Sequence, residues 1–401
     1  MVRHSRVPSV SSEICARTKL SVHFSVTKGL AGAGNVRFEG QADTACCAAR
    51  LDGVAMKIVS SWFYTHGDGE LGAYAQMRGG IASESFRDVY RRCIAVFFAT
   101  ARLVEPTARL VLFSNVTWDK SASRVSHEVE VLLRRLGVEI IQIPYSHEPP
   151  ATWPAAWRNQ FFVLDVLKWA AQTLCPDDEI LVLDSDIVWT GSPRTSNMWQ
   201  RVREDGGIAL SIDYAPDESV NSMSRREMTQ KMAGLNDAAL PLAYCGGEFV
   251  ALSGKIVQAY YLEAAAILLE NIDRSAGGTI YAFEEAHVLS VVNSRLGIQA
   301  GSANSFVKRL WTQPLKFKNA REDDVTLPLW HLPAEKRYGI RRLYRRVTSD
   351  ALSHSAEEAG HGLRPMAVRT LGACLGVPKN TPIKWVRDVS RASLGKLRIN
   401  R

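Results

Sequence analysis

The chain has 401 residues, of which 46% are hydrophobic and 22% are charged, so it can build a large apolar core and is not disordered overall. No apolar run reaches the roughly 18 residues of a membrane-spanning helix, and the basic N-terminus lacks the apolar stretch of a secretory signal. The net charge of +8 is concentrated in residues 341–401, which hold 13 Lys or Arg and 4 Asp or Glu. The rest of the chain is close to neutral, which argues against binding to nucleic acid.

Residues 1–55 differ in character from the sequence that follows them. They show little periodicity of apolar residues, so we expect a disordered extension or a stretch that precedes the natural start at Met56. A transit peptide is the alternative, because the stretch contains Arg and Ser and few acidic residues. The seven cysteines of the whole chain have no CxxC spacing, which favours reduced thiols in a cytoplasmic protein.

From Met56 onward, strand-like and helix-like segments alternate along the chain. Strands are predicted at 56–64, 109–115 and 138–144, and a fourth includes ILVL, directly before Asp184. Helices are predicted at 84–103, 124–136 and 154–174. This order predicts an α/β fold with a doubly wound, mostly parallel sheet over residues 56–340. A basic, partly helical tail is expected over residues 341–401.

The fourth strand ends in two carboxylates, Asp184 and Asp186, within ILVLDSDIVW. Residues i and i+2 of an extended strand point to the same side, so the two like charges repel each other. A divalent cation relieves that repulsion, and hard oxygen ligands suit Mg²⁺ or Mn²⁺. Open α/β sheets bind ligands at the carboxyl ends of their strands, which is where this pair lies. The alternative is a turn in which Asp184 serves as a cap.

The stretch LVLDSDIVW resembles the DxD motif of GT-A glycosyltransferases, which bind a nucleotide-sugar through a metal ion. Three later stretches resemble motifs of that family in the same order. AYCGGEFVALS is similar to the glycine-rich loop around the donor sugar and acceptor, and YAFEEAHVLS to the acidic motif at the head of a helix. LPLWHLPAEKRYG is similar to the His and Lys motif of glycogenin-like family 8 enzymes, but its spacing differs by one residue and the intervening glycine is absent. The resemblance covers about residues 56–340.

The resemblance implies a set of site residues. The metal ligands it implies are Asp184, Asp186 and His331. The donor-binding residues expected from the resemblance and from the end of the first strand are Ser60, Ser61, Trp62, Arg158, Ser185 and Lys336. Gly246 and Gly247 are expected to line the acceptor and sugar pocket. The catalytic candidates are Glu285, Glu284 and Glu248, and Glu285 or Glu284 would be the base if the enzyme inverts.

The resemblance implies a metal-dependent glycosyltransferase that moves a sugar from a nucleotide-diphosphate donor, such as a UDP-sugar, to a glycan or glycolipid acceptor. A bacterial surface glycan is one such acceptor, and the sequence does not choose between retention and inversion. One alternative is a haloacid-dehalogenase-like phosphatase, because DSDIV also satisfies DxDx[TV], with Asp184 as nucleophile and Asp186 as acid/base. The later acidic pair of that family would then be Asp323 and Asp324, which follow a polar stretch. A second alternative is an inactive domain that binds a nucleotide-sugar.

The end of the basic tail, IKWVRDVSRASLGKLRINR, interleaves apolar and cationic residues. At 100° per residue Trp385, Val389 and Leu397 lie close to one face of a helix, with cations around the rest. Such a helix can lie in a membrane interface and bind anionic lipid, which predicts peripheral contact at the inner face of the membrane. The alternative is a helix packed back on the domain with its basic face in solvent.

Overall fold

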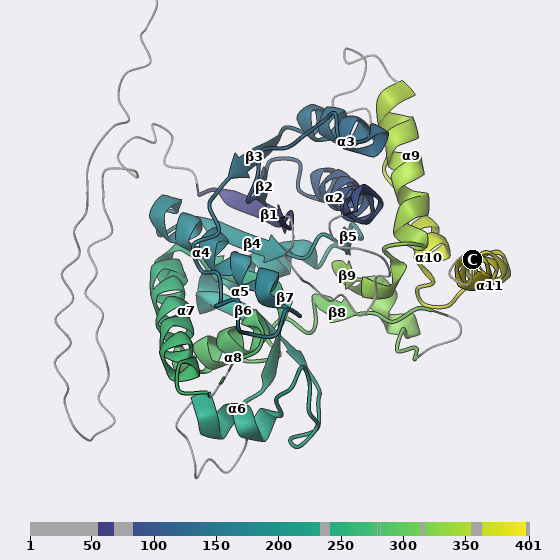
Figure 1. The fold of residues 1–401 in the computed structure, drawn as a ribbon. Coiled ribbons are helices and arrows are strands. Elements are labelled where there is room, and N and C mark those ends of the chain that lie inside the picture. Colours follow the sequence, from purple (N-terminus) through teal and green to yellow (C-terminus); the bar gives the residue numbers. More distant parts are fainter. Residues whose placement is uncertain are drawn as a thin grey trace, which may run out of the picture. The chain divides into compact units, whose positions relative to one another are not determined.

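The computed structural model describes residues 55–67, 83–232, 241–278, 280, 282–313, 317–353 and 363–397. The prediction for residues 1–55 therefore lies outside the described residues, except at Ala55. The described chain is built around a six-stranded sheet in the order β3-β2-β1-β4-β7-β6 (Figure 1). Its strands are β1 (Lys57–Phe63), β2 (Arg109–Ser114), β3 (Val138–Gln142), β4 (Glu179–Leu183), β6 (Gly207–Ile212) and β7 (Tyr244–Ser253).

The sheet is mostly parallel, as predicted. Strands β3, β2, β1 and β4 run parallel to one another, whereas β7 pairs antiparallel with both β4 and β6. The beginning of β7 therefore lies at the edge where the parallel strands end. The AYCGGEFVALS stretch, which the motif resemblance assigned to a loop, forms this strand. Its backbone bonds continue past β4, because Asp184 donates its N–H to the carbonyl of Glu248 over 3.1 Å.

Helices cover both faces of the sheet (Figure 1). Alternation along β2 shows the two faces: Leu110 and Leu112 are buried in one cluster with α2 and α3, and Val111 and Phe113 in another with α4 and α7. The helices and 3₁₀ turns of this part are α2 (Glu84–Val104), α3 (Arg124–Arg135), η1 (Arg158–Phe161), α4 (Phe162–Thr173), α5 (Thr195–Asp205), α6 (Arg225–Met232), α7 (Gly254–Ser275) and α8 (Glu285–Arg295).

Helix starts follow local capping. Ser83 and Ser123 cap α2 and α3 by accepting the N–H of Phe86 and Ser126 at 3.3 and 2.9 Å. The long helix predicted from residue 154 instead begins at Phe162. Trp157 has a φ of 71°, in the left-handed region, so the chain enters α4 through a 3₁₀ turn rather than a continuous helix.

A second, three-stranded sheet was not predicted. It has the order β5-β9-β8, formed by β5 (Ile187–Trp189), β8 (Val307–Arg309) and β9 (Leu329–His331). Ile187 pairs with His331 in antiparallel register. The chain directly after the Asp184–Asp186 pair is therefore tied to a strand that ends in the predicted metal-binding histidine.

The C-terminal elements after β8 are η2 (Glu322–Thr326) and η3 (Pro333–Glu335) on either side of β9, then α9 (Gly339–Ser353), α10 (Val368–Leu375) and α11 (Pro382–Leu397). Leu343, Leu371 and Leu375 are buried in the same apolar cluster as Trp330 of β9. Much of the basic segment is therefore part of the core. Among the described residues, no helix is long and apolar enough to cross a membrane.

The cysteines depart from the prediction at one position. Cys93, Cys245 and Cys374 are free thiols, as expected. Cys175 is disulfide-bonded, so the prediction of reduced thiols is wrong there.

Candidate active site

A pocket opens at the carboxyl edge of the parallel strands, where the chain leaves β1 and β4 and enters β7. Its lining includes the predicted acidic residues and both predicted residues of the C-terminal motif, His331 and Lys336. The predicted residues that line it are Trp62, Asp184, Ser185, Asp186, Gly247, Glu248, Glu284, Glu285, His331 and Lys336. Strand ends from both sheets and the first residues of α8 therefore meet in one cavity.

Asp184, Asp186 and His331 form a compact cluster, in which one ligand atom from each lies within 4.8 Å of the others. His331 Nε2 is 3.3 Å from Asp186 Oδ2 and 3.7 Å from Asp184 Oδ2. This nitrogen is buried and has no hydrogen-bond partner of acceptable geometry within the described structure. Two carboxylates and an imidazole facing one point are a donor set that a divalent cation can use.

The two carboxylates have different electrostatic surroundings. Burial and the charge of Asp186 raise the pKa of Asp184 to about 6. Burial also raises the pKa of Asp186, but Lys336 and His331 outweigh it and hold that pKa well below its ordinary value. Lys336 Nζ donates to Asp186 Oδ2 over 2.6 Å. Asp186 is therefore ionised and already paired with Lys336. Asp184 has no lysine at a comparable distance among the described residues, so a bound cation would stabilise its ionised form the most.

His331 is oriented by a second carboxylate behind it. Its Nδ1 donates to Glu248 Oε1 over 3.0 Å, and Arg309 binds both oxygens of Glu248 at 2.7 Å. Burial lowers the pKa of His331, but Asp186 and Glu248 together raise it to about 9. Histidine ligates metals only as neutral imidazole, so a cation here would take the place of the Nε2 proton. A carboxylate behind a ligating histidine is the usual arrangement that fixes its ring.

The paired glycines of β7 make room for carboxylates. A Cβ on Gly246 would lie 2.2 Å from Glu248 Oε2, and one on Gly247 would lie 2.2 Å from Glu285 Oε1. Neither glycine has a positive φ, so close approach and not backbone conformation requires them. The sequence interpretation of these glycines as space for a sugar is therefore incomplete, since acidic side chains fill part of that space.

Glu284 and Glu285 lie at the start of α8, as predicted, with Glu284 as its N-cap. Glu284 accepts hydrogen bonds from Tyr244 and from Asn221, the latter at 2.5 Å. Burial raises its pKa to about 7. Burial and the charge of Glu284 raise the pKa of Glu285 well above its ordinary value, and Glu285 Oε2 has no partner in the described structure. Glu285 thus offers the pocket a protonatable oxygen that no protein donor satisfies.

Four of the predicted residues do not line the pocket. Ser60 and Ser61 are fully buried within β1, and Ser60 Oγ donates to the carbonyl of Leu181 over 2.8 Å. Arg158 forms an ion pair with Glu148 at 2.8 Å and is absent from the lining residues. Gly246 lies one residue outside the lining, against Glu248. The serines lie in the part of β1 that is covered on both faces, whereas Trp62, near the end of the strand, reaches the pocket.

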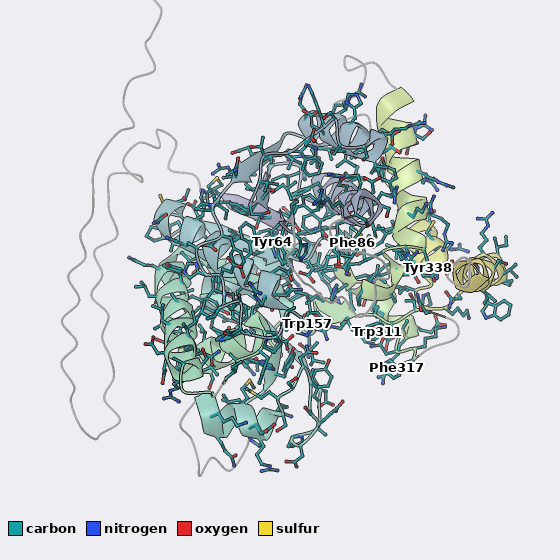
Figure 2. All side chains as sticks on the ribbon, viewed as in Figure 1. Tyr64, Phe86, Trp157, Trp311, Phe317 and Tyr338 are labelled. Atoms are coloured by element: carbon teal, nitrogen blue, oxygen red, sulfur yellow. The ribbon has the colours of Figure 1, made fainter. Side chains whose placement is uncertain are left out.

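Sequence reasoning missed the aromatic wall of the pocket and the arginine beneath it. Figure 2 labels four of these aromatic residues, Tyr64, Phe86, Trp157 and Trp311, which come from four separate segments. The only signal was the aromatic run that ends β1, WFYTH. The other missed lining residues are Phe63, His66, Arg87, Tyr90, Asn159, Gln160, Asn221, Tyr244, Ala286, Arg309 and Pro333.

The acidic pair that a phosphatase would need lies elsewhere. Asp324 belongs to η2 and accepts two bonds from Lys308 Nζ, at 3.0 and 2.9 Å. Neither Asp323 nor Asp324 is among the residues that line the pocket. The aspartate pair that the phosphatase alternative would use is therefore not part of this site in the described structure, where the other acidic pair is Glu284 and Glu285.

No protein-family model and no curated protein matches the chain. Solved structures of galactosyltransferase LgtC do match. One, in complex with donor and acceptor sugar analogs, has a TM-score of 0.41 and 14% identity over 69% of this chain and 86% of that chain. Another, of an active-site glutamine-to-glutamate mutant of LgtC, has a TM-score of 0.40 and 13% identity over the same shares. These neighbours are structures of a glycosyltransferase.

Proposed function

We propose that the protein is a metal-dependent glycosyltransferase that uses a nucleotide-diphosphate sugar. The observation that carries the proposal is the Asp184, Asp186 and His331 cluster at the strand ends, open to a pocket with aromatic walls. A hard divalent cation, Mn²⁺ or Mg²⁺, fits this cluster because two oxygen ligands and an oriented imidazole already face one point. When bound, it supplies positive charge for the diphosphate leaving group.

The chain's own groups divide the remaining work. Transfer breaks the bond between the sugar carbon and the diphosphate oxygen, so negative charge grows on that oxygen. Lys336 is buried beside Asp186 and presents a fixed ammonium to the same region, where low exposure to water strengthens its effect. The aromatic side chains of Trp62 and Tyr64 offer flat apolar surfaces to the base or sugar of the donor.

Glu285 is the best candidate for exchanging a proton with the acceptor hydroxyl. It lines the pocket and has an oxygen without a protein partner, whereas Glu284 is already held by Tyr244 and Asn221. Glu248 is tied to Arg309 and His331, which lowers its basicity, so it orients His331 rather than reacting. The acceptor would then enter past Gly247 and Glu285, and a glycan or glycolipid hydroxyl is the expected acceptor class.

Peripheral contact with a membrane is part of the proposal, with α11 as the contact. Ile383, Trp385 and Val386 are 65%, 45% and 55% exposed on this helix, next to the exposed Arg387. Lys384 and Asp388 turn inward instead. Apolar side chains flanked by cations suit an anionic lipid interface, where a lipid-linked acceptor would be found. The helix packs on the domain through Lys384 and Asp388, and the exposed side of it that carries Ile383, Trp385 and Val386 supports the proposed contact with lipid.

The test is release of free nucleotide diphosphate from a panel of nucleotide-sugars with Mn²⁺ present. We expect Asp184→Asn to lower turnover about 100-fold or more, as when one group that stabilises leaving charge is removed. Asp184 is the better target, because removing Asp186 would also leave Lys336 buried without its partner. Asp177→Asn, at an exposed position before β4, is the control and should keep full turnover.

A second measurement does not depend on knowing the donor. Mn²⁺ should raise the unfolding temperature of the original protein and of Asp177→Asn, but not that of Asp184→Asn, because only a folded site binds the ion. Equal shifts in all three proteins would contradict the metal site. Turnover by Asp184→Asn at the original rate would contradict the mechanism.

A further inference from the structure

The last helix reaches the active site through a buried charge cluster. Lys384 of α11 is 2% exposed, and its Nζ donates to Glu335 Oε1 over 2.8 Å and to Asp388 Oδ2 over 2.6 Å. Glu335 is fully buried at the end of η3. Asp388 also accepts from Arg342 of α9 at 3.0 Å. A lysine expected to lie on the solvent side of an amphipathic helix is instead enclosed by acidic partners.

Glu335 links Lys384 to two segments that line the pocket. Its Oε1 also accepts from Thr312 Oγ1 at 2.6 Å, and its Oε2 accepts the N–H of Gly339 at 2.8 Å. Thr312 directly follows the pocket residue Trp311, and Lys336 directly follows Glu335. The carbonyl of Thr312 is bonded as well, by Asn380 Nδ2 at 2.7 Å from the loop before α11.

The segment from His331 to Lys336 is thereby held from two sides. On the pocket side, Leu332 donates its N–H to the carbonyl of Asp186 over 3.1 Å, and Lys336 bonds the Asp186 carboxylate. On the far side, Glu335 is bonded to Lys384. Without the lysine, the donors to this fully buried carboxylate within the described structure would be a hydroxyl and an amide, a costly arrangement that is relieved by uptake of a proton or by movement of the segment.

We infer that Lys384 is a positioning residue, which acts through Glu335 to fix the segment that carries His331 and Lys336. It touches neither the ligand cluster nor the pocket. That Lys384 matters for catalysis rests on the proposed function. The restraint on residues 331–336 can be measured whether or not the proposed function is right. Through Glu335, the C-terminal helix thus helps to fix the positions of His331 and Lys336 relative to Asp184 and Asp186.

The experiment compares Lys384→Met with Lys379→Met. Lys379 lies in the same region, and its side chain is 78% exposed in a surface pair with Glu322, so it is the matched control. Hydrogen–deuterium exchange of the peptide covering 329–338 should become faster in Lys384→Met and stay unchanged in Lys379→Met. The dissociation constant for Mn²⁺ alone should rise about tenfold in Lys384→Met, the low end of the range for residues that orient metal ligands. Lys384→Arg should restore most of that affinity, because it can still pair with Glu335.

If Lys384→Met does not fold, the double variant Lys384→Met with Glu335→Gln replaces it, since it leaves no unpaired charge at Glu335. It should still show faster exchange at 329–338. Exchange at the original rate in whichever variant folds would overturn the inference, as would unchanged Mn²⁺ affinity together with a rigid segment. Absence of Mn²⁺ binding in the original protein would instead contradict the proposed function, while the exchange measurement would still decide the restraint.

Discussion

Gly247 shows how the site depends on the absence of a single carbon atom. A Cβ there would lie 2.2 Å from Glu285 Oε1, far inside contact distance. The carboxylate at the head of α8 can therefore approach β7 only because residue 247 has no side chain. The same holds at Gly246 for Glu248. The two glycines of β7 thus leave room for one carboxylate of the strand itself, Glu248, and for one from the start of α8, Glu285.

We expect Gly247→Ala to displace Glu285 and lower turnover with the best donor at least tenfold. Crowding of this kind also costs about 1–3 kcal/mol of stability. Gly277→Ala is the control, because a Cβ at that position meets nothing closer than 3.4 Å, the carbonyl oxygen of Arg274. Nucleotide diphosphate release and urea unfolding measure the two effects. Equal turnover in the two variants would show that Glu285 has room to move without consequence.

Among the site residues, the sequence predicted those whose polar or charged side chains stand in an otherwise apolar stretch. Two aspartates that follow an apolar strand, and a histidine between Trp330 and Leu332, indicate a ligand site from the pattern of residues alone. Arg309 carries no such signal. It reaches Glu248 because β8 pairs with β9, with Arg309 opposite His331, and that register is a property of the second sheet.

Among the elements, α11 has two different faces. Lys384 and Asp388 point into the domain, while Ile383, Trp385 and Val386 remain exposed. Of the predicted face, Trp385 is exposed and Val389 is half-buried, and Leu397 lies outside the described side chains. Periodicity alone could not show this, because it gives an apolar stripe without saying what covers it.

We expect Trp385→Ser combined with Val386→Ser to weaken cosedimentation with phosphatidylglycerol vesicles at low salt. Each large side chain withdrawn from the interface removes about 1.5–3 kcal/mol, so the affinity should fall tenfold or more. Rising salt should release the original protein, because the cationic contribution is screened. Leu269→Ser, at a 61% exposed position on α7, is the control. Equal binding by the double variant and the original protein would remove α11 as the contact.

The early elements matched their predicted ranges because short, strongly patterned segments between turns leave little ambiguity. The strand over 109–115 is observed as Arg109–Ser114 and the helix over 84–103 as Glu84–Val104. The second sheet escaped prediction because each of its strands has three residues, too few for a periodic pattern. The late start of α4 follows from the left-handed conformation of Trp157, which no residue pattern in the sequence indicates.

For the molecule as a whole, the C-terminal segment belongs to the core. Leu371, Leu375 and Val377 are buried with Trp330. A chain ending after Asp350 should therefore lose several well-buried side chains, each worth about 2–5 kcal/mol. At roughly 2–4 °C per kcal/mol, its unfolding midpoint should fall by about 10 °C or more. A chain ending after Leu397, at the end of α11, is the control and should keep the original midpoint.

A chain ending after Asp350 is not a suitable test of whether α11 contacts the membrane. A chain ending after Asp350 loses the Lys384 cluster as well as the exposed face of α11, so loss of vesicle binding by it would not separate the two. The surface variants of α11 separate them, because Lys384 and Asp388 remain in place. An unfolding midpoint unchanged by the deletion would show that α10 and α11 pack without contributing to stability.

The pairing of β5 with β9 has a consequence for how the protein is made. A ribosome releases Asp184 and Asp186 before His331, because a chain is synthesised from its N-terminus at about 5–20 residues per second. Until β9 emerges and adds beside β5, the nascent chain holds two neighbouring carboxylates with neither His331 nor Lys336 to compensate them. Pairing of β1 with β4 before β9 emerges would leave the repulsion between the two carboxylates to be relieved by water, protons or dissolved cations. The proposed metal site is therefore complete only after β9 has paired with β5, near the C-terminal end of the chain.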